Sequence, residues 1–240
     1  MSVATTMSGV TTMPSAEAGI VLCGGRSTRM GRDKNEVTWS GQTLLQQVVS
    51  AMEEVCSTLI LVKSAPEQTL PTLVWQRPPH VLLDEVPHDG PAASARVGLD
   101  YLQRTFFSDM TISANGEVAE SKATSPIVVL TGNDSPLLQP ALLRYLVARL
   151  RDQADCDAVV PGQSPSDSFP LCAAYRLSSR TALVNHLEQG GRSLKGWLGR
   201  LRVDWVSDSE LKMHDPDLRS LLNLNSPSDL QAAERVTDQH

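Results

Sequence analysis

The chain has 240 residues and a formal net charge of −6, with 41% hydrophobic and 20% charged residues. This composition is ordinary for a globular protein and argues against a disordered chain. The negative balance also argues against a nucleic-acid-binding surface, so a site for an anionic ligand must be local. No apolar run approaches the roughly 18 residues that a membrane-spanning helix needs, and we expect no membrane association.

The N-terminal residues and the cysteines indicate the cellular compartment of the protein. Residues 1–17 are rich in Ser, Thr and Met and read as a disordered tail; they carry no basic segment followed by an apolar one, so they do not predict a secretion signal. The four cysteines lie far apart and form no CxxC pair: Cys23, Cys56, Cys156 and Cys172. We predict reduced thiols in a cytoplasmic protein.

Short apolar runs alternate with amphipathic stretches along the rest of the chain. In chain order, the periodicity predicts a strand at 18–23, a helix at 44–55, strands at 59–62 and 81–83, a helix at 91–104, a strand at 126–130, a helix at 142–150, strands at 158–160 and 169–175, a helix at 182–188, a strand at 202–206 and a helix at 226–235. This alternation predicts one α/β domain over 18–240, a mostly parallel, Rossmann-like three-layer α/β/α sheet. The polar stretch near 108–125 reads as a surface insertion.

Ligands of such sheets bind beyond the carboxyl ends of the strands, and the first strand is followed by LCGGRSTRMGRDK, Leu22–Lys34. Gly24 and Gly25 allow a sharp turn and bring backbone N–H groups close to a ligand. Four basic residues follow, and they suit phosphate oxygens: Arg26, Arg29, Arg32 and Lys34. The stretch predicts a phosphate-binding loop, and the plainer alternative is a glycine turn with a solvated basic loop.

Two familiar phosphate-binding patterns are absent, because the chain contains neither GxxxxGK[ST] nor GxGxxG here. A P-loop GTPase and a dinucleotide-binding dehydrogenase are therefore disfavoured. The tetrapeptide GGRS recurs at 190–193, where it follows a predicted helix, and at this second place we expect a helix C-cap.

Two aspartates also follow predicted strands. Asp134 lies in TGNDSP, directly after the strand at 126–130, and Asp84 ends the strand at 81–83, ahead of Gly90-Pro91. A carboxylate at a strand end suits Mg²⁺, which takes one or two carboxylates together with phosphate oxygens. The alternative for each is a turn or helix N-cap aspartate.

The run Leu22–Lys34 resembles the signature of MobA-like nucleotidyltransferases, and the fit is closest to molybdenum cofactor guanylyltransferases. The matching residues are Leu22, Gly24, Gly25, Arg29, Met30, Gly31, Asp33 and Lys34. Downstream, 133–136 is similar to the family's metal-binding turn, Asp84 with Gly90-Pro91 to its nucleotide contact, and NLNSPSDL at 223–230 to its C-terminal motif. The resemblance spans residues 18 to about 235.

The resemblance implies transfer of GMP from GTP to the phosphate of molybdenum-molybdopterin, with Mg²⁺ as cofactor. It implies catalytic roles for Lys34, Arg29 and Asp134, with Asp134 as the metal ligand. The implied nucleotide-binding residues are Leu22, Cys23, Gly24, Gly25, Lys34, Asp84 and Asp134. The implied partners are GTP and molybdopterin, together with proteins that deliver or accept molybdopterin.

The chain departs from the family pattern at several positions. Asn35 and Glu36 replace apolar residues, Ser94 stands in a helix start that has lost a glycine and a leucine, and Asn133 replaces a cysteine. These departures leave the choice of base and the level of activity open. The alternatives are a molybdopterin cytidylyltransferase or another sugar- or alcohol-phosphate nucleotidyltransferase, and, in another class, a non-catalytic GTP-binding accessory protein.

Overall fold

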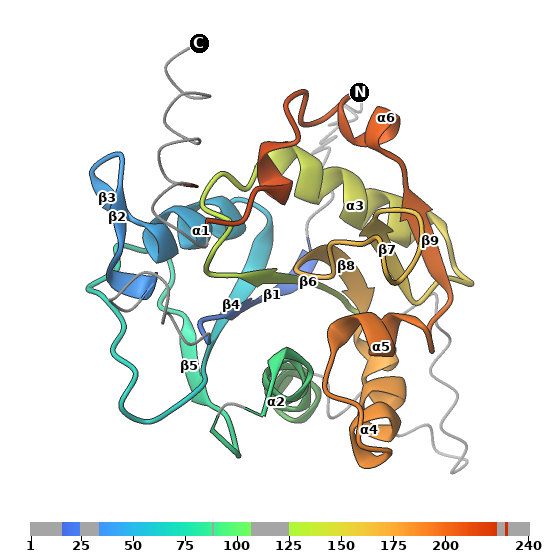
Figure 1. Ribbon diagram of the computed structural model, residues 1–240, viewed down its shortest axis with the longest axis horizontal. Helices are drawn as coiled ribbons and strands as arrows, with labels where there is room; N and C mark the ends of the chain where they lie inside the picture. The colour runs from blue at the N-terminus through green and yellow to red at the C-terminus, as the bar shows by residue number, and fades with distance from the viewer. Residues whose placement is uncertain (1–15, 25–33, 88, 107–124, 225–228, 230–240) are drawn as a thin grey trace, which may run out of the picture.

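The computed structural model describes residues 16–24, 34–87, 89–106, 125–224 and 229 (Figure 1). These residues form a seven-stranded sheet in the order β5-β4-β1-β6-β8-β7-β9. Its strands are β1 (Ala16–Leu22), β4 (Cys56–Lys63), β5 (His80–Leu83), β6 (Ile127–Gly132), β7 (Ala158–Pro161), β8 (Cys172–Arg176) and β9 (Val203–Val206). The helices are α1 (Leu44–Glu53), α2 (Pro91–Phe106), α3 (Pro140–Asp152), α4 (Arg180–Glu188), α5 (Leu194–Leu198) and α6 (Asp208–Leu211).

The sheet is mostly parallel, as predicted. Strands β5, β4, β1 and β6 pair in parallel, as do β7 and β9, and only β8 runs antiparallel to its neighbours β6 and β7. From β1 the chain builds outward through β4 and β5, then returns to the other side of β1 as β6. This reversal of direction opens a crevice at the carboxyl ends of β1 and β6, where such sheets bind ligands.

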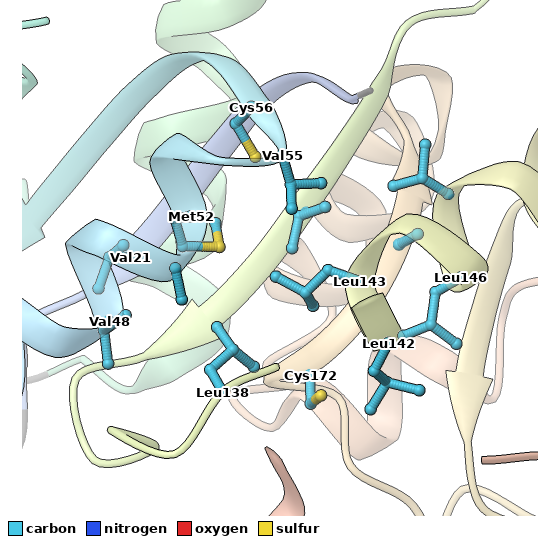
Figure 2. Packing of buried hydrophobic residues seen from close by; sticks show 14 of the residues in the cluster. Val21, Val48, Met52, Val55, Cys56, Leu138, Leu142, Leu143, Leu146 and Cys172 are labelled. Carbon is cyan, nitrogen blue, oxygen red and sulfur yellow. The ribbon is translucent and has the colours of Figure 1, made fainter. Parts of the chain in front are cut away.

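Helices cover both faces of the sheet, which gives the predicted three layers (Figure 1). Helices α1 and α3 pack on one face, where Met52 and Leu143 are fully buried, and Figure 2 shows both side chains in the cluster that also includes Val21 of β1. Helices α2, α4 and α5 cover the other face around Trp197. The two clusters hold the sheet rigid, so the loops at its carboxyl edge rest on a fixed frame. No helix of the described residues is long and apolar enough to cross a membrane.

The predicted strand at 169–175 begins only at Cys172, so its first three residues were assigned wrongly. The Cys172 N–H donates to the Phe169 carbonyl at 3.0 Å, which closes a turn, and Pro170 has no N–H to offer a neighbouring strand. Short elements were not predicted, among them α5, α6, the hairpin β2 (Thr38–Trp39)–β3 (Gln42–Thr43) and the 3-10 helices η1 (Lys34–Glu36), η4 (Leu177–Ser179) and η5 (Arg219–Leu221). The predicted helix at 226–235 apart from residue 229, residues 1–15 of the predicted tail and nearly all of the predicted insertion near 108–125 lie outside the described residues. The last two residues of the predicted tail, Ala16 and Glu17, were assigned wrongly, because they belong to strand β1, where Ala16 pairs with Cys56 of β4.

The second GGRS, at 190–193, ends helix α4 as predicted. Gly190 has a φ of 83° and the Gly191 N–H donates to the His186 carbonyl at 2.9 Å, the arrangement of a glycine C-cap. Gly191 is also required by packing, since a Cβ there would lie 2.1 Å from Cε1 of the buried His186 ring.

We therefore expect Gly191→Ala to lower the free energy of unfolding by about 1–3 kcal/mol, the usual effect of overpacking. Urea denaturation followed by circular dichroism measures this change. Gly199→Ala is the matched control, because a Cβ at Gly199 meets its nearest atom at 3.5 Å and its φ of −63° suits alanine. Equal stability of the two variants would contradict the packing argument.

Candidate active site

A cavity of about 500 Å³ lies at the carboxyl ends of β1, β4, β5 and β6. Residues that directly follow each of these strands contribute to its wall, among them Gly24, Ser64, Asp84, Asn133 and Asp134. It therefore occupies the crevice that the strand order creates, and it is large enough for a nucleotide-sized ligand.

Four of the predicted nucleotide-binding residues line this one cavity: Leu22, Gly24, Asp84 and Asp134. Cys23 lies between Leu22 and Gly24 with only 1% of its surface exposed, and it does not line the cavity. Gly25 and Arg29 lie outside the described residues. The backbone of Lys34 begins η1, and its side chain lies outside the described part of the chain.

Gly24 is required by the close approach of two strand ends. A Cβ at Gly24 would lie 2.7 Å from the Cβ of Ser64, which follows β4. Ser64 cannot move away easily, because its backbone N–H donates to Gln68 Oε1 at 2.9 Å. A glycine here allows the end of β1 to pack closely against Ser64 beside the cavity, as the start of the predicted phosphate-binding loop requires.

Asp134 is presented by a turn that is held at several points. The Asn133 N–H donates to the Leu22 carbonyl at 3.1 Å, which extends the contact between β1 and β6, and the Asp134 carbonyl accepts the Leu224 N–H at 2.8 Å. Ser135 Oγ donates to Asn223 Oδ1 at 2.9 Å. The segment that begins the predicted C-terminal motif thus packs on the turn that presents Asp134.

Asp84 is buried, with 5% of its surface exposed, and its N–H donates to the Lys63 carbonyl at 2.9 Å. Its Oδ2 accepts a hydrogen bond of 2.7 Å from Ser94 Oγ in the first turn of α2. Ser94 also lines the cavity. The residue that departs from the family pattern therefore orients the predicted nucleotide contact, a role that sequence reasoning missed because it treated Ser94 only as a loss.

The chemistry of the cavity suits a divalent cation that binds together with phosphate. Within the described ranges, no group of three or more His, Cys, Asp and Glu side chains could hold a metal by itself. A carboxylate beside a predicted phosphate-binding loop is a donor set that Mg²⁺ accepts, since this ion keeps waters and takes phosphate oxygens. The residues present therefore fit Mg²⁺ at Asp134.

Cys156 and Cys172 do not fit the role of a thiol nucleophile. None of the four cysteines forms a disulfide, as predicted. Burial raises the pKa of Cys172 to about 12, and burial together with nearby aspartates raises the pKa of Cys156. Both thiols therefore stay protonated near neutral pH, so neither serves as the thiolate that such chemistry requires.

Residues 19–203, more than half of the chain, match the MobA-like NTP transferase domain family. The chain is 28% identical to the molybdenum cofactor guanylyltransferase of Desulfosudis oleivorans over 220 residues, which cover 91% of this chain and 95% of that protein. The molybdopterin-guanine dinucleotide biosynthesis protein A of Archaeoglobus fulgidus has the same fold, with a TM-score of 0.68 and 23% identity over 93% of this chain and 100% of that one. A Mycobacterium tuberculosis protein in complex with manganese superimposes with a TM-score of 0.50 and 16% identity, over 80% and 88% of the two chains. The chain belongs to the MobA-like NTP transferase domain family.

Proposed function

We propose that this protein transfers GMP from GTP to the phosphate of molybdenum-molybdopterin, giving molybdopterin guanine dinucleotide and pyrophosphate. The names of its relatives support guanylyl transfer in molybdenum cofactor synthesis. Four cysteines that form no disulfide favour a cytoplasmic setting.

The observation that carries the proposal is the shared cavity. Gly24, at the start of the phosphate-binding loop, and Asp134, the predicted metal ligand, come from distant parts of the sequence and line the same space of about 500 Å³. Helix α2 begins at Pro91 on the rim of this cavity, and the positive end of a helix favours an anion.

The reaction needs no general base from the protein. The nucleophile is an oxygen of the molybdopterin phosphate monoester, which is largely ionised at neutral pH. It attacks the α-phosphorus of GTP; a new P–O bond forms while the bond to the bridging oxygen breaks and pyrophosphate leaves with the electron pair. Catalysis then consists of holding two anions together and offsetting the charge that develops on the leaving oxygens.

Each residue of the site has a separate role in binding or in charge stabilisation. The amides of Gly24 and Gly25 and the ammonium group of Lys34 bind the triphosphate, and Arg29 offsets the remaining negative charge. Asp84, oriented by Ser94, holds the nucleoside end. Asp134 would hold the Mg²⁺, which supplies electrostatic stabilisation of the phosphate oxygens when bound; the manganese complex of a structural relative supports a divalent cation.

The decisive experiment incubates the full chain with molybdenum-loaded molybdopterin and either Mg-GTP or Mg-CTP and identifies the dinucleotide by mass spectrometry. We expect the guanine dinucleotide and pyrophosphate from GTP and little product from CTP. A cytosine dinucleotide would assign the protein to cytidylyl transfer instead. GTP binding without any pyrophosphate would identify a non-catalytic accessory protein.

A further inference from the structure

Three side-chain amides converge on one backbone oxygen beside the cavity, the carbonyl oxygen of Cys23. Asn133 Nδ2 lies 3.1 Å from this oxygen, Asn35 Nδ2 lies 3.4 Å from it, and Gln68 Nε2 also donates to it. Cys23 is the residue between β1 and Gly24. The end of β1 is therefore tied to three other segments through their side chains.

Two of these amides also bond to each other. Asn133 Nδ2 donates to Asn35 Oδ1 at 2.7 Å, although the two residues are 98 positions apart in the sequence. Asn133 is 3% exposed and Asn35 is 0% exposed. Removing one asparagine takes this hydrogen bond from a buried polar atom of the other, and the desolvation of that atom then costs free energy without compensation. Each asparagine therefore stabilises the other.

Each asparagine is the direct neighbour of a residue with a proposed catalytic role. Asn35 follows Lys34 in η1, and Asn133 precedes Asp134 after β6. We infer that the Asn35–Asn133 pair positions the Lys34 backbone against the Asp134 turn, so that the lysine and the carboxylate serve one triphosphate. This inference rests on the roles proposed above for Lys34 and Asp134, and the two asparagines are positioning residues that act through these neighbours.

The hydrogen-bond pattern requires an amide at position 133. The two N–H bonds of its NH₂ group are both used, one toward the Cys23 carbonyl and one toward Asn35 Oδ1. An aspartate has the same shape but offers no donor when ionised, and it would set negative oxygens against two acceptors. An apolar residue leaves both acceptors without this donor. What matters at position 133 is the donor chemistry rather than the volume.

A buried pair of this kind could also serve stability alone, and the two roles differ in what they change. A purely stabilising pair lowers the melting temperature when it is removed but leaves the folded site intact. A positioning pair lowers kcat and cation affinity in protein that is still folded. If the pair positions the site, the two single changes break the same hydrogen bond. Removing both asparagines then lowers kcat and cation affinity little more than removing one.

The test uses Asn35→Ala, Asn133→Ala and the double variant of the full chain. Mn²⁺ binding in the presence of GTP is measured by electron paramagnetic resonance, and kcat is measured at a temperature where near-ultraviolet circular dichroism shows each variant to be folded. We expect each single change to weaken Mn²⁺ binding and lower kcat roughly 10–100-fold, as changes beside metal ligands do. The double variant should fall within about threefold of the weaker single one. If an alanine variant does not fold, the serine variant replaces it, because a hydroxyl is too short to span the pair.

Ser179→Ala is the matched control. Ser179 is 3% exposed, its Oγ donates to the Arg176 carbonyl at 2.6 Å, and it does not line the cavity. We expect this change to lower the melting temperature and to leave kcat and Mn²⁺ affinity unaltered.

The outcomes separate this inference from the proposed function. Asparagine variants that lose melting temperature but keep kcat and Mn²⁺ affinity would overturn the positioning role, and so would losses that multiply in the double variant. If Asp134→Asn also keeps Mn²⁺ affinity, the proposed metal site itself fails. If Asp134→Asn loses it while the asparagine variants do not, only the positioning inference fails.

Discussion

Asp134→Asn is expected to abolish most Mg²⁺-dependent pyrophosphate release, with kcat falling roughly 10²–10³-fold or more, the effect of removing one electrostatic group from a transfer site. Stability should change by less than about 1 kcal/mol, because the change is isosteric. One of the bonds that hold the turn is donated by the Leu224 N–H to the Asp134 backbone carbonyl, and an asparagine retains it. A coupled pyrophosphate assay with Mg-GTP and molybdenum-loaded molybdopterin measures the loss, and urea denaturation measures the stability.

The control for this change is Asp152→Asn, which removes the same charge from an exposed position at the end of α3. We expect this control to keep full activity. Pyrophosphate release that persists unchanged in Asp134→Asn would exclude Asp134 as the metal ligand and leave it as a turn residue.

Part of the site could be predicted because ligands of a parallel sheet bind beyond the carboxyl ends of its strands. Asp84 and Asp134 were selected because each lies just beyond the end of an apolar run, and a parallel sheet gathers such residues at one edge. Leu22 was selected through the resemblance to the family signature. All three line one cavity. The elements themselves were recognisable because long buried strands and amphipathic helices have strong periodicity.

The interactions between distant polar residues could not be predicted. Asn35 and Asn133 look like two unrelated departures in the sequence, whereas the structure joins them by a hydrogen bond of 2.7 Å. Ser94 likewise looks like a lost glycine, yet its hydroxyl bonds to Asp84 Oδ2 at 2.7 Å. Such pairings depend on the three-dimensional approach of segments, and no local pattern in a single sequence records them.

Element ends were predicted less well than element types, for a related reason. Strand β4 begins at Cys56 and helix α3 at Pro140, both earlier than the apolar runs that predicted them. Pairing with a neighbouring strand continues the ladder past the apolar core of a strand, as Cys56 opposite Ala16 shows. Proline is favoured at the first position of a helix, so α3 begins at Pro140, ahead of the apolar residues that predicted it.

Gly132→Ala is expected to lower kcat roughly 10²-fold without unfolding the protein. Gly132 ends β6, and a Cβ there would lie 2.6 Å from Asp134 Oδ1. The carboxylate is the flexible partner in this clash, so it moves while the strand stays in place. A displacement approaching 1 Å of a catalytic group costs about 10²-fold in rate. The backbone itself accepts alanine, because Gly132 is not among the glycines with positive φ. Alanine also lowers the conformational entropy of the unfolded chain, and this stabilising effect offsets part of any strain in the folded protein.

This change tests the position of the Asp134 carboxylate, whereas Asp134→Asn tests its charge, and the two should not combine. In the double variant Gly132→Ala/Asp134→Asn we expect the kcat of Asp134→Asn alone, because a carboxylate that is absent cannot be displaced. Gly199→Ala controls for the added methyl group, since its Cβ contacts nothing closer than 3.5 Å. A Gly132→Ala protein with full kcat and unaltered Mn²⁺ affinity would mean that the carboxylate works from elsewhere in the cavity. Losses that multiply in the double variant would mean that Gly132 acts on the site through some route other than Asp134.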